Sequence, residues 1–567
     1  MSVEIPPPAN DRPKGDRVLF IGLDGATFQV LQPLCDAGFM PNLARMLAGG
    51  AFGTLLSTVP PISAPAWTTF ITGKNPGKHG ILHFVSFDWQ RELEALGQGV
   101  EISPGVFAVV NANSIRDATL WQMVSKAGRR LVSMNVPMTY PPKPVNGLMV
   151  ACMLTPPNAK EFTFPAQLKD ELGDYEIELN LKEKDFQTLG PAVITRLIEI
   201  MDKRATAALG LMQRQPWDLF ALVFTETDRI QHRFWHELVA PDGTIARTEG
   251  AYAILLRQFY SRLDHWIGRL TDAAGPTATT VIMSDHGFTA MPRRHLYMQG
   301  LAQALGLFSF ARASTLGRLR AFGEARLGLS YAALYGVAAK VLPRRLLGSV
   351  VARLRRSDRS AQATQKGQVV RLQEQVGGVL VGAVPDAERV HLLDDLRARL
   401  LALQDPHDGR KVVRDVRRSE EVYSGPFVAR FPPLVFFLER DYALASGTGP
   451  RGEVVAHTRA TPAQSGTHDR EGILALLGQG VRPGRLTRSP SIEDVTATIL
   501  YCLGIDIPSD IDGRVLTEAF EPSVFESRPV SIGDANLVVQ ADAALTGYSQ
   551  SEEEAVAARL RGLGYIE

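Results

Sequence analysis

Two short stretches of the chain pair a carboxylate with an imidazole at spacings that suit a metal ion. In FTETDRIQHRFWH, Asp228 and His232 are four residues apart, so on a helix they share one face and could bind one cation. In SDHG, Asp285 and His286 are adjacent and need the sharp turn that Gly287 permits. A surface pair is the simple alternative for the first stretch, so neither establishes a metal site alone.

Three further residues could complete such a site. Asp24 follows the apolar run RVLFIGL, although Asp-Gly after a strand is also typical of a plain turn. Ser63 precedes Pro65 in a stretch closed by Gly73, which predicts a helix beginning at Ser63. There its oxygen could bind a metal while the helix dipole stabilises a phosphoryl oxygen, or it could simply cap the helix. His468 is expected in a loop before another strand, as a third imidazole or as a surface residue.

The neighbouring polar residues are weaker candidates. His236 continues the helical face of Asp228 and His232, and we expect it behind the ligands or in packing. The helix that begins at Ser63 also contains three threonines, which we expect to be poorer nucleophiles: Thr68, Thr69 and Thr72.

Alternating strands and helices must position these residues. Short apolar runs, each bounded by polar or turn residues, predict strands, and helical patterns such as VITRLIEIMDKRATAALGLM lie between them. This alternation predicts an α/β fold with a doubly wound, mostly parallel sheet flanked by helices, which binds ligands at the carboxyl ends of its strands. The runs are Arg17 to Leu23, Leu131 to Pro137, Trp217 to Phe224, Thr279 to Ser284 and Gly472 to Gly478.

The composition changes between about Phe308 and Arg371, where the chain is rich in arginine and leucine. From Arg312 to Arg371 there are thirteen Lys or Arg against two acids. We expect a basic helical insertion, acting as a lid or contacting a membrane surface or an acidic partner. The expected organisation is a first part of the catalytic core at 1–307, the insertion at 308–375, a second part of the core at 376–530 and a C-terminal docking helix at 531–567.

Bulk properties limit the partners and the compartment. The formal net charge of +1 predicts no general attraction to nucleic acid. Three widely spaced cysteines, Cys35, Cys152 and Cys502, suit a reducing compartment better than a disulfide framework. The polar, proline-rich start lacks the apolar core of a secretory signal, and no run is long enough to span a membrane. We therefore expect a cytoplasmic protein.

Longer blocks of sequence carry a family resemblance. They are FIGLDGATF, PAWTTFITGKNPGKHGI, NVPMTYPPKPVNGLMV, DRIQHRFW, SDHGF, GTHDREGI and LRGLGYIE. With the order Asp, Ser, Asp-x-x-x-His, Asp-His and a late His, the chain resembles the type I phosphodiesterase and nucleotide pyrophosphatase branch of the alkaline phosphatase superfamily. Its nearest likeness is to bacterial and archaeal members described as predicted phosphohydrolases or phosphomutases.

The resemblance implies an alkaline phosphatase-like fold and a two-metal phosphohydrolase acting on a small-molecule phosphodiester or phosphomonoester. One divalent metal would be bound by Ser63 with Asp24, Asp285 and His286, and the other by Asp228, His232 and His468. Nitrogen and oxygen ligands without a thiolate favour Zn²⁺, with Mn²⁺ as the alternative. Two such ions against three carboxylates leave a formal charge of about +1, which favours an anionic substrate. Ser63 would form a phosphoseryl intermediate.

The chain departs from the family pattern at two places. Ser63 stands where nucleotide pyrophosphatases carry threonine, and the asparagine expected about twenty residues later is absent. His83, Asn75 or Lys78 could replace it, but nucleotide diesters become weaker candidate substrates. Trp67 stands where a sulfatase would have arginine, which argues against sulfatase chemistry. The alternatives are a phosphoryl transferase or mutase using the same site, and a non-catalytic phosphate-binding scaffold.

Overall fold

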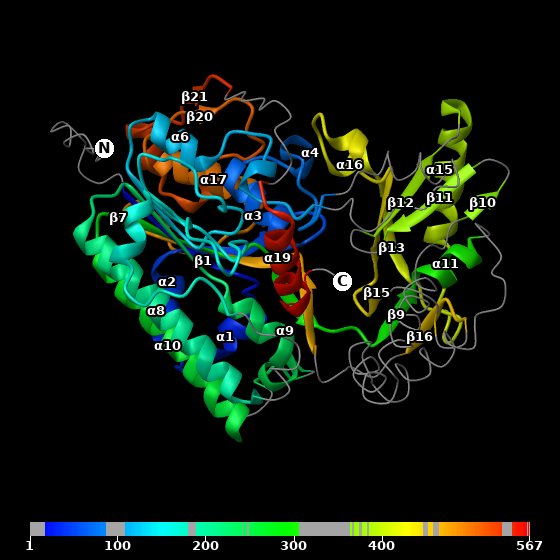
Figure 1. The fold of residues 1–567 in the computed structure, drawn as a ribbon, viewed down its shortest axis with the longest axis horizontal. Helices are drawn as coiled ribbons and strands as arrows, with labels where there is room; N and C mark the ends of the chain where they lie inside the picture. The colour runs from blue at the N-terminus through cyan, green and yellow to red at the C-terminus, as the bar shows by residue number, and fades with distance from the viewer. Residues whose placement is uncertain are drawn as a thin grey trace.

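A nine-stranded sheet lies at the centre of the molecule (Figure 1). The structure is a computed structural model that describes residues 17–86, 108–179, 189–240, 242–245, 249–305, 363–365, 368–373, 377–382, 385–445, 449, 452–457, 464–535, 547–563 and 565. The strand order is β19-β2-β18-β7-β1-β6-β3-β4-β5. The strands are β1 (Arg17–Leu23), β2 (Ala51–Leu56), β3 (Leu131–Met134), β4 (Gly147–Val150), β5 (Thr163–Phe164), β6 (Leu219–Phe224), β7 (Ala278–Met283), β18 (Glu471–Leu477) and β19 (Gly484–Arg485).

The middle of this sheet is parallel. Strand β1 pairs in parallel with β7 on one side and with β6 on the other, and β3 continues the parallel set between β6 and β4. Strand β18 runs antiparallel to both β7 and β2, and β5 is antiparallel to β4. The predicted α/β fold with a mostly parallel sheet flanked by helices is therefore confirmed.

Helices cover both faces of the sheet because its central strands are apolar on both sides. Along β1, Val18 and Phe20 belong to one buried core, whereas Leu19, Ile21 and Leu23 belong to the other. The first core contains α3 (Ser63–Thr72), α6 (Leu120–Lys126), α17 (Ile492–Cys502) and α19 (Gln550–Leu563). The second contains α1 (Phe28–Asp36), α2 (Pro41–Gly49), α8 (Ala192–Arg214), α9 (Glu226–Leu238) and α10 (Ala251–Ala274), at the lower left of Figure 1.

A smaller lobe is inserted into this core, on the right of Figure 1. The chain leaves after β8 (Gly287–Ala290) and returns at β17 (Gly466–Asp469), and these two strands pair with each other. Between them the lobe has its own hydrophobic cluster and two sheets, ordered β10-β11-β12-β14-β13 and β15-β9-β16. Its elements are β9 (Arg294–Tyr297), α11 (Met298–Ala304), β10 (Ala363–Gln365), β11 (Gln368–Gln373), β12 (Gly378–Gly382), α15 (Asp386–Leu401), β13 (Val413–Arg418), α16 (Ser419–Val422), β14 (Leu434–Leu438), β15 (Tyr442–Ala445) and β16 (Val455–His457).

This lobe divides the chain differently from the sequence-based boundaries. Most of the expected helical insertion, 306–362, lies outside the described residues, as do the basic surface and the partner contact assigned to it. The described end of that segment forms strands β10 and β11. Strand β10 pairs with β11, and β11 pairs in turn with β12. The described residues between 377 and 457, which we assigned to the core, belong to the lobe together with β9 and α11, and the chain rejoins the large sheet only at β18.

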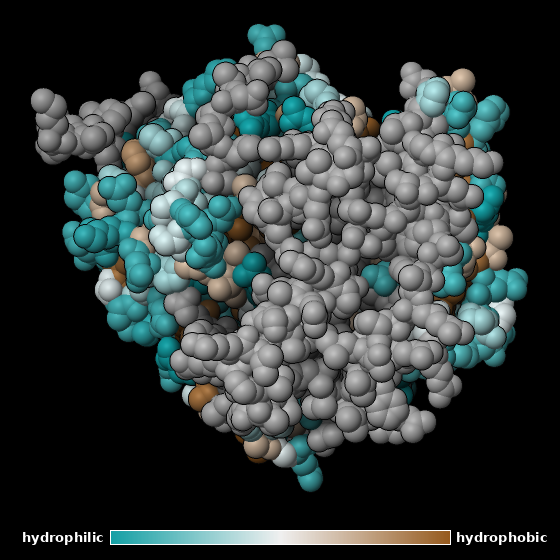
Figure 2. All heavy atoms as spheres, turned by 45° about the vertical axis from the view of Figure 1, so that its right-hand side comes forward, coloured by the Kyte–Doolittle hydropathy of each residue, from teal (hydrophilic) through white to brown (hydrophobic). Residues whose placement is uncertain are grey.

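On the face shown in Figure 2, most of the coloured atoms, those of described residues, are hydrophilic, with smaller hydrophobic areas among them. Large exposed apolar side chains in these parts of the chain are scattered, at Leu189, Ile254, Val390, Val530 and Ile532. No helix in the ranges given above is long and apolar enough to cross a membrane. The three cysteines are buried free thiols.

We expect Phe70→Ala to lower the free energy of unfolding by about 3–5 kcal/mol, because it leaves a cavity beside the central strand. Phe70 is fully buried, and its ring stacks on that of Phe20 in β1 with centroids 4.3 Å apart. Urea denaturation checks the loss. The control is Ile254→Ala, at a side chain 49% exposed, which should cost about 0.5 kcal/mol. Equal losses in the two variants would contradict this packing.

Candidate active site

Neighbouring parallel strands bring the first three candidate residues together. Asp24 follows β1, and Asp285 and His286 follow β7, whose carboxyl end lies beside that of β1. His286 Nε2 lies 3.3 Å from Asp285 Oδ2 and 3.7 Å from Asp24 Oδ1. The backbone N–H of Gly25 donates to Asp285 Oδ1 over 3.0 Å. All three side chains are buried.

Two glycines allow this close approach, for different reasons. Gly25 has a φ of +69°, and a Cβ there would lie 2.7 Å from the Phe288 ring. Gly287, expected to permit a sharp turn, is not in the left-handed region; instead, a Cβ would lie 2.0 Å from the carbonyl oxygen of Glu471. Glycine is needed at Gly287 because strand β18 runs directly against it.

Ser63 is the first residue of α3, as predicted. Its Oγ lies 3.2 Å from His286 Nε2 and 3.5 Å from Asp24 Oδ1. One turn later, Trp67 Nε1 donates to the other oxygen of Asp24 over 3.2 Å. The threonine hydroxyls of α3 have other hydrogen-bond partners. Two of them donate to backbone carbonyls of the same helix, Thr68 to Ala64 O and Thr72 to Thr68 O, and the third, of Thr69, bonds to the His79 ring. The serine therefore faces the carboxylates and the imidazole at the strand ends.

Asp228 and His232 lie on α9, directly after β6, which flanks β1 on its other side. His232 Nε2 is 3.4 Å from Asp228 Oδ1, so the predicted shared helical face is confirmed. His468 Nε2 lies 3.0 Å from His232 Nε2 and 3.3 Å from Asp228 Oδ1. We expected His468 in a loop, but it belongs to strand β17 and pairs with Phe288 of β8.

His236 lies apart from these residues. The helix is kinked at Phe234, where φ is −121° and ψ is 22°, so the four-residue periodicity does not continue past His232. His236 is exposed and its Nε2 lies 3.3 Å from Glu237 Oε1. The expectation that it lies behind the ligands or in packing was wrong.

The two groups of candidate ligands meet at His286. Its ring centroid lies 3.7 Å from that of His468. Two sets of side chains have donor atoms close enough to hold one ion each: Asp24 with Asp285 and His286, and Asp228 with His286 and His468. His232 adds a further nitrogen to the second set. The structure thus places all seven predicted residues in one site, in which His468 is partly exposed and the other six are buried.

Three buried carboxylates give this site its electrostatic character. Burial raises the pKa of Asp24 well above its ordinary value, and repulsion from Asp285 and Asp228 adds to this. Burial likewise raises the pKa of Asp285 to about 7. Burial also favours a raised pKa for Asp228, but the two imidazoles beside it and Arg229 hold that pKa well below its ordinary value. The site has an excess of negative charge that a cation would relieve.

Two oxygens in the site fit a divalent metal ion. Asp228 Oδ1 and Asp285 Oδ2 are buried and accept no hydrogen bond. A buried carboxylate oxygen without a donor is costly, and each of these oxygens faces an imidazole nitrogen that can also ligate metal. Burial lowers the pKa of His286 well below its ordinary value, which keeps its ring neutral as metal binding requires. The donor set is one of carboxylate oxygens and imidazole nitrogens.

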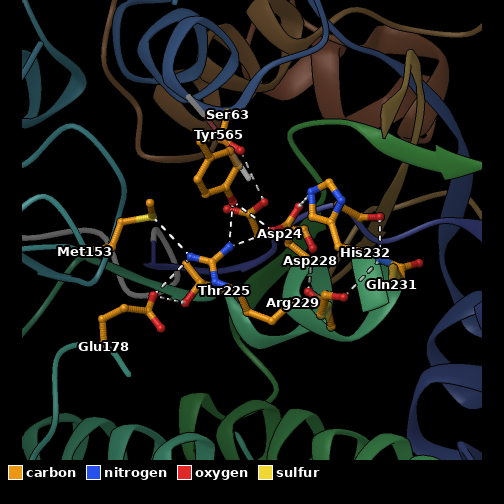
Figure 3. Close-up of polar contacts among 12 residues, drawn as sticks. Asp24, Ser63, Met153, Glu178, Thr225, Asp228, Arg229, Gln231, His232 and Tyr565 are labelled. Atoms are coloured by element: carbon orange, nitrogen blue, oxygen red, sulfur yellow. Dashed lines mark hydrogen bonds and ion pairs between the residues drawn. The ribbon is translucent and has the colours of Figure 1, made fainter. Parts of the chain in front are cut away.

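Sequence reasoning missed the residues that surround Asp228. Figure 3 shows Arg229 pointing toward Asp228, Tyr565 and Glu178. Arg229 Nη1 lies 2.6 Å from Asp228 Oδ2, and Nη2 lies 3.1 Å from Glu178 Oε2. The arginine beside Asp228 in DRIQH was a signal that could have been used. The contact of Tyr565 had no local signal, because Tyr565 is 337 residues from Asp228.

The candidates for the missing asparagine have other contacts. Asn75 Nδ2 donates to Asp512 Oδ2 over 2.8 Å, and Lys78 pairs with the same aspartate. His83 is buried and lies edge-on to Phe84, with ring centroids 6.5 Å apart. These contacts hold Asn75 and Lys78 against the loop that carries Asp512.

The sequence profile of the family described as type I phosphodiesterase / nucleotide pyrophosphatase matches residues 18–470. A comparison with curated protein sequences gives no match.

Three solved structures are similar to this chain. Phosphonoacetate hydrolase from Sinorhizobium meliloti 1021, in complex with phosphonoformate, is 16% identical over 87% of this chain and 97% of its own, with a TM-score of 0.48. Murine ectonucleotide pyrophosphatase / phosphodiesterase 5 is 12% identical over 89% of this chain and 100% of its own, with a TM-score of 0.45. Wild-type alkaline phosphatase PafA is 15% identical over 90% of this chain and 100% of its own, with a TM-score of 0.48.

We expect Asp285→Asn to stabilise the metal-free protein at about pH 8, because it removes one of three repelling buried charges and keeps an acceptor for Gly25 N–H. The folded-state pKa of Asp285, about 7, lies above the ordinary 3.8, so the wild-type carboxyl loses its stabilising proton as pH rises through 7. The increase in the free energy of unfolding caused by Asp285→Asn should therefore be smaller at about pH 5. Urea denaturation in chelator at both pH values measures it.

Asp264→Asn is the matched control. Asp264 is also buried, but its carboxylate accepts from the backbone N–H groups of Asn42 and Leu43 at the start of α2. Its substitution should destabilise the protein at both pH values. A loss of stability in Asp285→Asn at about pH 8 would contradict the excess of negative charge.

Proposed function

The chain belongs to the type I phosphodiesterase / nucleotide pyrophosphatase family, and from this premise we propose that it is a two-metal phosphohydrolase with Ser63 as its nucleophile. Membership makes it a phosphoester hydrolase. The proposal adds the nucleophile, the metals and the covalent intermediate. The observation that carries it is the position of Ser63 Oγ, 3.2 Å from His286 Nε2 and 3.5 Å from Asp24 Oδ1.

The metal ligands follow from the two groups of side chains. Asp24, Asp285 and His286 with Ser63 would hold one ion, and Asp228, His232 and His468 the other. Bound divalent ions supply positive charge that lowers the pKa of a coordinated hydroxyl and neutralises phosphoryl oxygens. The oxygen and nitrogen donors suit Zn²⁺, with Mn²⁺ as the alternative.

The chain itself provides the nucleophile and fixes its direction. Ser63 releases its hydroxyl proton to solvent, Oγ forms a bond to phosphorus as the bond from phosphorus to the alcohol oxygen breaks, and the departing alcohol oxygen takes up a proton from solvent. Because Ser63 begins α3, the positive end of the helix dipole favours the negative charge on the nucleophile and on the phosphoryl group. Water then attacks the phosphoserine, which releases phosphate or a phosphomonoester and restores Ser63.

The proposed substrate is a small phosphodiester or phosphomonoester. Three carboxylates neutralised by two divalent ions leave a site that favours an anion. Nucleotide diesters are not included in the proposal, because Asn75 and Lys78 bind Asp512 and no asparagine follows Ser63 at the expected distance.

We expect Ser63→Ala to reduce turnover of nitrophenyl phosphate mono- and diesters by at least about 1,000-fold, since it removes the oxygen that attacks phosphorus. Release of nitrophenol from the metal-loaded protein measures this, with phosphonate esters included to define the class. Thr68→Val is the control, because it removes a hydroxyl of the same helix that binds only Ala64 O. Full activity of Ser63→Ala would exclude the phosphoseryl intermediate.

Removal of metal should abolish turnover, and re-addition of about two equivalents of Zn²⁺ or Mn²⁺ should restore it, because both ligand groups are needed. Elemental analysis before and after dialysis against a chelator gives the stoichiometry. Turnover that persists in protein containing less than about 0.1 metal ion per chain would contradict metal dependence. Comparing the two reconstituted forms identifies which ion supports the reaction.

A further inference from the structure

Tyr565, which follows helix α19, lies inside the candidate active site. Helix α19 packs Val556, Leu560 and Leu563 into the main core beside the sheet. Two hydrogen bonds hold it: Tyr548, just before the helix, donates to Leu154 O over 2.7 Å, and Arg559 Nη1 on the helix donates to Met153 O over 2.6 Å. In Figure 1 this helix runs through the middle of the molecule, between the large sheet and the lobe.

Just beyond α19, Tyr565 reaches the metal-ligand candidates. Its side chain is buried, and its hydroxyl lies 2.9 Å from Asp228 Oδ2. Its ring packs on Phe84 with centroids 4.6 Å apart and faces the two imidazoles of the second ligand group, His232 at 6.4 Å and His468 at 6.2 Å. Figure 3 shows the ring beside Ser63.

Hydrogen-bond polarity fixes the direction of the tyrosine proton. Arg229 Nη1 lies 2.6 Å from the Tyr565 oxygen and 2.6 Å from Asp228 Oδ2. Arginine can only donate, so the phenol oxygen accepts from Arg229, and an ionised carboxylate can only accept, so in the contact with Asp228 Oδ2 the phenol is the donor. Arg229 is held in turn by Glu178 and by the sulfur of Met153, 3.4 Å away. Tyr565 and Arg229 therefore both donate to the same carboxylate oxygen, Asp228 Oδ2.

The two oxygens of Asp228 consequently have different surroundings. Oδ2 receives two hydrogen bonds, from Tyr565 and from Arg229. Oδ1 receives none and faces the imidazole nitrogens of His232 and His468, at 3.4 and 3.3 Å. Two donors on one oxygen prevent the carboxylate from rotating and keep the other oxygen toward the metal position. The phenol does so without a positive charge that would repel a cation.

We propose that Tyr565, supplied by the C-terminal segment, is a positioning residue that orients Asp228 for metal binding. The active site of this chain then includes a residue that lies beyond residues 18–470, the part matched by the family profile. The proposal rests on the proposed function, because it requires a metal ion at Asp228.

Zinc affinity of the intact, metal-stripped protein tests the proposal. In competition with a chromophoric chelator, Tyr565→Phe should bind one of the two zinc ions about 10-fold more weakly than wild type, with the other unchanged. The ring remains in Tyr565→Phe, so the packing on Phe84 is kept. Activity lost by this variant at limiting zinc should return as zinc is raised, which a general folding defect would not produce.

The matched control is Tyr548→Phe, which removes a phenol of the same segment that binds a backbone carbonyl outside the site. It should leave both zinc affinities unchanged. A second variant that lacks residues 565–567 removes the ring as well and should weaken the same zinc ion at least as much.

The outcomes separate this inference from the proposed function. Wild-type and Tyr565→Phe proteins that bind two zinc ions with equal affinity would overturn the positioning role and leave the proposed function standing. Wild-type protein that binds no zinc or manganese would overturn both. A similar loss of affinity in Tyr548→Phe would show that docking of the segment matters and that the Tyr565 hydroxyl has no specific role.

Discussion

Burial of three carboxylates at one edge of a sheet is the constraint on which this site depends. Asp24, Asp228 and Asp285 are all fully buried, and removing carboxylates from water costs several kcal/mol each unless opposite charge lies close by. Arg229 supplies one positive charge, and its guanidinium is shared with Glu178. Divalent cations at the two groups of ligands would provide the remainder, and the helix end at Ser63 favours the further negative charge of a phosphoryl group.

Sheet topology creates this concentration of charge. Strands β7, β1 and β6 are adjacent and parallel, so the residues that follow them emerge side by side at the same edge. The lobe between β8 and β17 does not disturb this arrangement, because the chain leaves and returns through two paired strands. That pairing places His468 beside His286 although 182 residues separate them in the chain.

The second ligand group depends on parts of the chain that meet only after folding. Asp228 lies on α9, His468 on β17 and Tyr565 beyond α19, and each reaches the site from a different direction. The geometry of this ligand group therefore depends on the correct packing of each of these three elements. The C-terminal segment is secured by Tyr548, Arg559 and the apolar face of α19, so the position of Tyr565 is determined by contacts well outside the site.

Local features of the sequence determined the fold class and most of the site. The apolar runs ending at Leu23, Phe224 and Ser284 predicted the three central strands, and Pro65 with Gly73 predicted the helix that begins at Ser63. Periodicity and helix signals act over a few residues, so they can be recognised without the fold.

Tertiary structure decided what periodicity could not. The kink at Phe234 excluded His236, strand pairing placed His468, and strands β12 to β16 joined a lobe with its own hydrophobic cluster. Folding also brought Tyr565 to Asp228. These outcomes depend on contacts between residues far apart in the chain, and the local sequence around each of them does not encode which distant partner it will meet.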